Sequence, residues 1–295
     1  MATTKITNPE LFDLASLDSA LKLPSGSTAE RPTSPSTGEW RYNTDNNLIE
    51  YYDGSAWIDL QDEDIPPIPS EHFNTVLYDG TSATHAITGV GFQPDLVWIK
   101  DRGNSEQHVL NDSSRGATKD LSTNSTAAEA TRTTGFTSFD SDGFTLGTDG
   151  GGLVNDSSRG PYVAWCFKAN GGTTSSNPDG SITSTVQVNT KAKFSIVTYT
   201  GDGANGTVGH GLGVTPEIVL TKRTDSTSNW SFNGNIGGFV YGSNVINLNS
   251  DAALRSDTNE VLAATSTTFT AGTSGSVGAS GGDYVAYCFT SVNGY

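Results

Sequence analysis

The segment PYVAWCFKANG at residues 161–171 has a counterpart in DYVAYCFTSVN at residues 283–293. Two further pairs share nearly the same offset, 121 or 122 residues: FNTVLYDG (73–80) with FSIVTYTG (194–201), and QPDLVWIK (93–100) with TPEIVLTK (215–222). Three separated blocks with one offset indicate an internal repeat. We therefore predict two copies of one fold, at residues 72–172 and 194–295, joined by a linker at 173–193.

The final segment of each copy has the alternation of a buried β-strand. Successive residues of YVAWCF point to opposite faces of an extended chain, and both faces are largely apolar. Such a strand belongs in the centre of a two-layer sandwich. The fold class we expect is all-β: two tandem β-sandwich repeats of jelly-roll type, preceded by a short N-terminal helix and a small β-hairpin module. A strand-like segment at 181–188 is assigned to neither copy.

Residues 8–21 have the pattern of an amphipathic helix. Asn8 is a suitable N-cap, and Pro9 suits the first helical position. Four leucines follow at helical spacing: Leu11, Leu14, Leu17 and Leu21. Because so short a helix is not stable alone, its stripe packs either on the same chain or in an assembly with other chains. We interpret residues 1–28 as a segment for oligomerisation.

Residues 29–60 are expected to form the β-hairpin module. Aromatic-rich strands at 40–42, 48–52 and 56–60 are separated by turns rich in Asp, Asn and Gly. A sheet of this size is marginal in water and needs partners. Residues 61–71, QDEDIPPIPSE, are acidic and proline-rich, which favours an extended spacer.

Charge and composition exclude several classes of protein. The chain has 16 basic and 32 acidic residues, and the net charge of −16 disfavours nucleic acid as a partner. No apolar run approaches the roughly 20 residues of a membrane helix, and no signal peptide is expected. Cys166 and Cys288 occupy equivalent strand positions, so both are expected to be buried free thiols.

The acidic loop FDSDGFTLGTDGGG carries three carboxylates that could bind Ca²⁺, on Asp140, Asp142 and Asp149. However, its spacing differs from that of an EF-hand, Asp-x-Asp-Gly is a common hairpin turn, and the second copy lacks these acids. We favour a turn, with no metal and no cofactor. The histidines have no metal-ligand spacing, and neither a G-x-S-x-G elbow nor a dinucleotide fingerprint is present, so no enzyme is predicted.

Carbohydrate binding is a function that the loops favour. Sugars stack on aromatic faces, and their hydroxyl groups bond to Asn, Asp and Ser side chains on loops. In the second copy the candidates are Trp230, Asn233, Tyr241 and His210, the last of which is flanked by glycines. The alternative for the aromatic residues is packing in the core or within a strand. The hexapeptide NDSSRG, at 111–116 and again at 155–160, has the composition of an Asx turn.

The stretch from residue 23 to residue 57, with ERPTSPSTGEWRYNT and EYYDGSAW, resembles a module of bacteriophage fibre and appendage proteins. The repeats resemble a domain of tail-fibre-like proteins of marine phages, through GVGFQPDLVWIKDR, DSDGFTLG, YVAWCFKANGG and TVGHGLGVTPEIVLTK. The resemblance implies a homotrimeric or otherwise oligomeric, β-rich virion protein. Its N-terminal part would be attached to the particle and its C-terminal domains displayed outward. No catalytic residue is implied.

We therefore expect a phage tail fibre or similar appendage protein. It would contact neighbouring virion proteins through residues 1–60 and bind a host-surface glycan or protein through the repeats. It would assemble in the host cytoplasm and be exposed on the particle. Two alternatives remain open: a capsid decoration or head-fibre protein without a receptor role, and a glycan depolymerase, whose pair of carboxylates the sequence does not identify.

Overall fold

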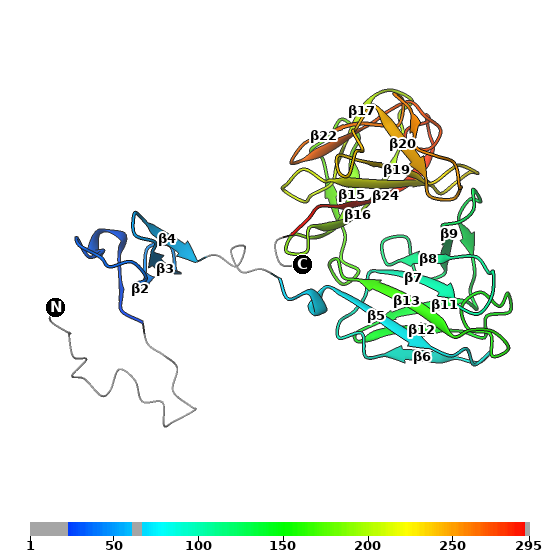
Figure 1. The fold of residues 1–295 in the computed structure, drawn as a ribbon, viewed down its shortest axis with the longest axis horizontal. Helices are drawn as coiled ribbons and strands as arrows, with labels where there is room; N and C mark the ends of the chain where they lie inside the picture. Colours follow the sequence, from blue (N-terminus) through cyan, green and yellow to red (C-terminus); the bar gives the residue numbers. More distant parts are fainter. Residues whose placement is uncertain (1–22, 61–66, 293–295) are drawn as a thin grey trace. The chain divides into compact units, whose positions relative to one another are not determined.

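The computed structural model describes residues 23–60 and 67–292, and in these ranges the chain forms β-strands and no α-helix. The all-β prediction is confirmed for this part of the chain. The protein consists of two compact units, residues 1–65 and residues 66–295 (Figure 1). The helix predicted around Leu11, Leu14, Leu17 and Leu21 lies outside the described residues. Within the described ranges, no helix is long and apolar enough to span a membrane.

The N-terminal unit contains a four-stranded sheet. Its strands pair in chain order, the first pair parallel and the others antiparallel: β1 (Ser25–Gly26), β2 (Trp40–Asn43), β3 (Leu48–Tyr52) and β4 (Trp57–Leu60). A 3₁₀ turn, η2 (Thr28–Glu30), follows β1. The three aromatic-rich strands were predicted, whereas the two residues of β1 carry no strand pattern of their own.

Buried ion pairs occupy the centre of this small sheet. Oε2 of the fully buried Glu50 accepts hydrogen bonds from Arg31 Nη2 at 2.5 Å and Asn43 Nδ2 at 3.1 Å. Arg41 Nε lies 3.4 Å from Oε1, and the Arg41 guanidinium lies over the Trp57 ring. Hydrogen bonding from Arg31 lowers the pKa of Glu50. Among residues 23–60 no apolar side chain is buried, so these charged and aromatic contacts occupy the place of an apolar core.

The C-terminal unit begins with a 3₁₀ turn, η4 (Pro69–Glu71), and has two halves, which we define as residues 67–172 and 173–292. Each half has a large sheet and a three-stranded sheet. The large sheet of the first half has the spatial order β10 (Ala130–Thr131), β9 (Lys119–Ser122), β8 (Val109–Asp112), β7 (Leu96–Asp101), β13 (Tyr162–Phe167), β5 (Phe73–Tyr78). Its small sheet is β11 (Phe136–Asp140), β12 (Gly143–Leu146), β6 (His85–Thr88).

The second half is arranged in the same way, with two additional strands at one edge of its large sheet. The spatial order is β14 (Ser175–Asn177), β15 (Ser184–Asn189), β16 (Phe194–Thr200), β24 (Asp283–Phe289), β18 (Ile218–Arg223), β19 (Ser231–Gly234), β20 (Asn244–Asn247), β21 (Arg255–Ser256). The small sheet is β17 (Gly206–Gly209), β23 (Thr268–Ala271), β22 (Val261–Ala264). The last strand of each half has equivalent neighbours: β13 lies between β5 and β7, and β24 lies between β16 and β18.

The segment 173–193 differs from the linker that we expected. β15 pairs with β16 along its whole length, and β14 pairs with β15. The strand-like stretch at 181–188 therefore extends the large sheet of the second half, because an apolar strand beside an open sheet edge completes its hydrogen bonds by pairing there.

Each half has its own core between its large and small sheets. In the first half, Ile99 and Ala164 of the large sheet share a core with Phe136 and Phe144 of the small sheet. In the second half, Val219 and Ala286 share one with Val261 and Phe269. Cys166 and Cys288 lie in these two separate cores as free thiols, as predicted, and burial raises the pKa of each to about 12.

A stacked tyrosine pair recurs in the two cores. Tyr78 and Tyr162 stack with 5.2 Å between ring centroids, and the Tyr78 hydroxyl donates to the carbonyl oxygen of Val154. Tyr199 and Tyr284 also stack at 5.2 Å, and the Tyr199 hydroxyl donates to the carbonyl oxygen of Val277. In both halves the pair anchors the loop that leads into the last strand.

A third apolar cluster joins the two halves. Leu96, Leu110 and Leu121 of the first half pack with Phe194, Ile196, Trp230, Val285 and Tyr287 of the second. These residues lie on the faces of the large sheets that point away from the two inner cores. The halves therefore associate sheet against sheet (Figure 1).

Both copies of NDSSRG form a turn in which the aspartate carboxylate accepts from a backbone N–H two or three residues later. Asp112 Oδ1 accepts from the backbone N–H of Arg115, and Asp156 Oδ1 accepts from that of Ser158. Each aspartate also pairs with the arginine three residues later, at 2.6 Å for Asp112–Arg115 and 3.4 Å for Asp156–Arg159. The repeated sequence thus encodes a turn in which one carboxylate caps the backbone and holds an arginine.

Candidate functional site

Trp230, a predicted sugar-stacking residue, lies between the two halves of the C-terminal unit. Its side chain is fully buried and stacks on Tyr287, and its Nε1 donates to the carbonyl oxygen of Ser122 at 2.9 Å. A ring enclosed in this way offers no face to a sugar. The structure therefore corrects its role: Trp230 joins the halves, which was the alternative considered for the aromatic candidates.

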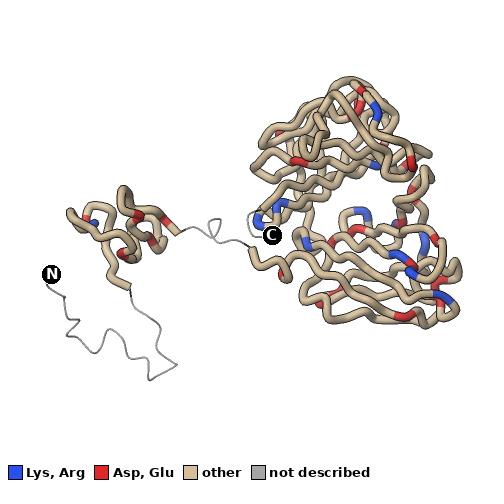
Figure 2. Tube along the Cα trace, viewed as in Figure 1, with Lys and Arg blue, Asp and Glu red and all other residues tan. Residues whose placement is uncertain are grey.

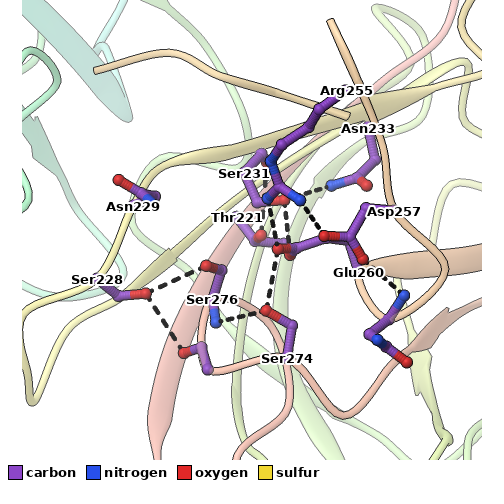
Figure 3. Close-up of polar contacts among 12 residues, drawn as sticks. Thr221, Ser228, Asn229, Ser231, Asn233, Arg255, Asp257, Glu260, Ser274 and Ser276 are labelled. Carbon is purple, nitrogen blue, oxygen red and sulfur yellow. Dashed lines mark hydrogen bonds and ion pairs between the residues drawn. The ribbon is translucent and has the colours of Figure 1, made fainter. Parts of the chain in front are cut away.

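Asn233 belongs to a buried polar cluster of the second half (Figure 3). Its Nδ2 donates to Ser231 Oγ at 2.8 Å, and its Oδ1 accepts from the backbone N–H of Val261. Both ends of the amide are therefore engaged inside the protein. The structure corrects this prediction too, because Asn233 links β19 to β22 and does not reach a surface ligand.

Glu260 is the centre of the same cluster (Figure 3). Its carboxylate accepts from Ser231 Oγ at 2.8 Å, Ser274 Oγ at 2.9 Å and Arg255 Nη2 at 3.3 Å, and Arg255 also pairs with Asp257. No histidine is among the partners of Glu260 to activate either serine as a nucleophile. The cluster is a network of hydrogen bonds and ion pairs in which Glu260 is buried and Arg255 is partly exposed, and it connects the loops around β22.

His210 and Tyr241 also have structural contacts. The His210 side chain is fully buried; Nδ1 accepts from the backbone N–H of Leu212, so Nε2 carries the proton and donates to the carbonyl oxygen of Thr265 at 3.1 Å. Burial lowers its pKa. The half-buried Tyr241 donates its hydroxyl to the carbonyl oxygen of Pro216. The four predicted residues therefore do not form one surface site.

The three aspartates of the acidic loop have separate partners. Asp140 accepts from two hydroxyl groups, Asp142 accepts from the backbone N–H of Gly91 at 2.6 Å, and the buried Asp149 pairs with Arg132 at 2.5 Å. Their carboxylates do not converge on a common point. Among the described residues, no group of three or more His, Cys, Asp or Glu side chains could hold a metal ion.

A cleft of ≈ 490 Å³ lies on the first half, next to the contact with the second. Its aromatic wall comes from the outer faces of β7 and β13, where the register pairs Trp98 with Trp165. The two indole rings lie 5.7 Å apart at an interplanar angle of 58°, so they form an angled platform. Phe167 extends this wall, and Leu248 of the second half closes one side.

Polar residues form the rest of the cleft. The pairing of Ile99 with Val109 places Lys100 opposite His108 on the same face of the sheet. Thr123 follows on the next strand, where its backbone N–H donates to the carbonyl oxygen of His108 at 2.9 Å. Asn124 accepts from the backbone N–H of His108 at 3.0 Å. Four polar side chains thus border two tryptophans.

Two buried polar atoms on the cleft lining have no hydrogen-bond partner. They are Nε1 of Trp98 and Oγ1 of Thr123, whose residue is 1% exposed. A buried polar group left unpaired costs about 1–3 kcal/mol. Because each atom has less than 1 Å² exposed, a ligand hydroxyl in the cleft would pair it only after a change of side-chain rotamer.

Sequence reasoning missed this cleft for an identifiable reason. The alternation of YVAWCF predicts that Trp165 lies inside a sandwich, because both faces of that strand are apolar. The available signal was that the equivalent positions in the second copy hold Leu220 and Tyr287, so only the first copy has two tryptophans side by side. The sequence alone does not place Trp98 beside Trp165, because that requires knowing that β7 and β13 are neighbours in the sheet.

Fold and cleft together define an all-β protein whose two halves pack sheet against sheet and leave an aromatic-lined cleft beside their contact. Over residues 68–295 the chain matches the family described as a domain of unknown function (DUF7483), and it belongs to that family. The match begins close to the start of the C-terminal unit. No curated protein and no solved structure matches the chain.

Proposed function

We propose that this protein is a phage virion appendage protein whose C-terminal unit binds host-surface carbohydrate in the cleft of Trp98 and Trp165. The appendage assignment is supported by the resemblance of residues 23–57 and of the repeats to phage fibre proteins. The binding assignment is supported by the chemistry of the cleft, which is independent of that resemblance.

The observation that carries the binding proposal is the combination of an aromatic platform with unpaired buried polar atoms. The apolar C–H face of a pyranose ring packs on aromatic rings, while its hydroxyl groups both donate and accept hydrogen bonds. Trp98 and Trp165 provide the platform. Trp98 Nε1 and Thr123 Oγ1 are the atoms that a sugar hydroxyl would pair.

We propose binding without hydrolysis. Glycoside hydrolysis generally uses two carboxylates on either side of the scissile bond. Of the described residues that line this cleft, none is Asp or Glu. The depolymerase alternative therefore gains no support from this site.

We further propose that the two halves are jelly-roll-like copies of one ancestral domain. The equivalent places of β13 and β24, and the stacked tyrosine pairs, support this interpretation. In this scheme residues 1–60 attach the protein to neighbouring virion proteins. The protein is a homotrimer, assembled in the host cytoplasm and exposed on the particle.

The test uses the full-length protein on an array of neutral and acidic bacterial saccharides, followed by calorimetric titration of the ligands found. Trp98→Ala and Trp165→Ala should each weaken binding about tenfold or more. Trp40→Ala is the matched control, because Trp40 is 48% exposed in the N-terminal unit and does not line the cleft. Failure of the folded protein to bind any saccharide, or wild-type affinity in both cleft variants, would overturn the proposal.

A further inference from the structure

We propose that the ligand of this cleft is an acidic saccharide, with a carboxylate or sulfate group held beside Lys100 and His108. This inference rests on the proposed carbohydrate binding and adds the chemical class of the sugar. It is carried by the positive charge of Lys100 on the cleft lining and by the hydrogen bonds of its ammonium group, which go to backbone carbonyl oxygens.

The cleft differs in charge from the protein as a whole. The chain carries a net charge of −16, and Figure 2 shows acidic residues on strands and loops of both halves. The described residues that line the cleft include Lys100 and His108 and no carboxylate. A cationic hollow in an acidic protein attracts anions selectively, because a cleft concentrates the local field.

Among the described residues, no carboxylate forms an ion pair with Lys100. Its Nζ donates to the backbone carbonyl oxygens of Asp101 at 2.5 Å and Asn104 at 2.8 Å, which position the ammonium group but carry no net charge. The nearby carboxylate of Asp101 accepts from the backbone N–H groups of Gly103 and Asn104 and from Asn104 Nδ2. It is therefore turned into its own loop, and one N–H of the Lys100 ammonium remains for a ligand.

His108 provides a second hydrogen-bond donor on the same side of the cleft as Lys100. It lies opposite Lys100 on the neighbouring strand, and burial, followed by the charge of Lys100, lowers the pKa of its imidazole. A neutral imidazole donates from one ring nitrogen. Lys100 and His108 could therefore bond to two oxygens of one anionic group, while Trp98 and Trp165 hold the sugar ring.

A neutral sugar would satisfy only part of this site. It could stack on the tryptophans and pair Thr123 Oγ1, but it would leave the Lys100 charge without a counterion. Charge-assisted hydrogen bonds are roughly twice as strong as neutral ones. The acidic class therefore pairs the Lys100 charge as well, and the neutral class does not.

The test compares each saccharide that binds the full-length protein with its neutralised form, prepared by methyl esterification of carboxylates or by desulfation. The acidic form should bind about tenfold or more tightly than the neutral form. Lys100→Met, which keeps most of the side-chain length, should abolish this preference, so that the acidic and neutral forms bind this variant equally. Lys168→Met is the control for net charge, because Lys168 lies over the Phe92 ring and does not line the cleft.

Two outcomes would overturn the inference, and they are distinguishable. Equal binding of acidic and neutral forms, or an unchanged preference in Lys100→Met, would overturn the acidic class and leave carbohydrate binding intact. Absence of binding to every saccharide would overturn the proposed function itself and this inference with it.

Discussion

The Tyr287 hydroxyl donates a 2.6 Å hydrogen bond to Oδ2 of Asp112 across the contact between the two halves of the C-terminal unit. Both side chains are almost fully buried, and the same Oδ2 accepts from Arg115 Nε at 2.6 Å. Asp112 is the aspartate of the first NDSSRG turn. The turn thus also presents a fixed acceptor to the second half, so the halves associate through a specific polar contact as well as through apolar packing.

Tyr287→Phe should lower the free energy of unfolding by about 1–3 kcal/mol, because it removes a partner of a buried carboxylate. Urea denaturation would measure the loss. Tyr241→Phe is the matched control, since the Tyr241 hydroxyl bonds only within the second half, to Pro216 O. It should cost about 1 kcal/mol and leave the contact between the halves unchanged. Wild-type stability in Tyr287→Phe would contradict the role given to this bond.

Thr123→Val should separate binding from folding. Oγ1 of Thr123 has no partner in the free protein, so its removal should leave stability unchanged or raise it by up to about 1 kcal/mol. Saccharide affinity should fall about fivefold or more, because the ligand loses a hydrogen bond. Thr145→Val is the control, since Thr145 Oγ1 bonds to Asp140 and its loss should destabilise the protein without changing affinity. Clear destabilisation by Thr123→Val would show that Oγ1 is already paired.

Lys222 should make stability depend on pH above neutrality. The fully buried ammonium donates to the carbonyl oxygens of Ser228 and Thr126, and burial lowers its pKa from 10.5 to about 8. Between these values the unfolded chain binds more protons than the folded one, so stability rises as pH increases from about 8 to 10.5. The rise attributable to Lys222 is up to about 3 kcal/mol.

The measurement for Lys222 is the difference in free energy of unfolding between the wild type and Lys222→Met across that range. Taking the difference cancels the titration of other groups. The difference should move in favour of the wild type as pH rises, and it should be flat below pH 8, where Lys222 is protonated in both states. A flat difference throughout would mean that the folded state does not depress this pKa.

Glu260 should matter for stability and not for binding. Glu260→Ala leaves two serine hydroxyls without their acceptor, whereas the partly exposed Arg255 keeps Asp257, and it should cost about 1–3 kcal/mol. Glu260→Gln keeps an acceptor oxygen and should cost less. Saccharide affinity measured on the folded Gln variant should equal that of the wild type. Loss of affinity in that variant would place the cluster of Figure 3 in the binding machinery.

Much of the local structure could be predicted from the sequence. The strands at 40–43, 48–52 and 57–60, the buried thiols of Cys166 and Cys288, and the NDSSRG turns follow from patterns within a few residues. The sheet that the strand at 184–189 joins could not be predicted in this way. A single strand-like segment does not indicate with which sheet edge it will pair.

The alternation of β13 by itself determined that Trp165 and Phe167 share one face of a strand, because an extended backbone turns successive side chains to opposite sides. Only the tertiary structure decided which part of that face is covered. The second half packs on Leu96, Leu110 and Leu121 and buries its own Trp230 and Tyr287 there, while Trp98 and Trp165 remain on the wall of the cleft. Side-chain direction is a local property of the chain, whereas exposure depends on which residues distant in the sequence pack against that face.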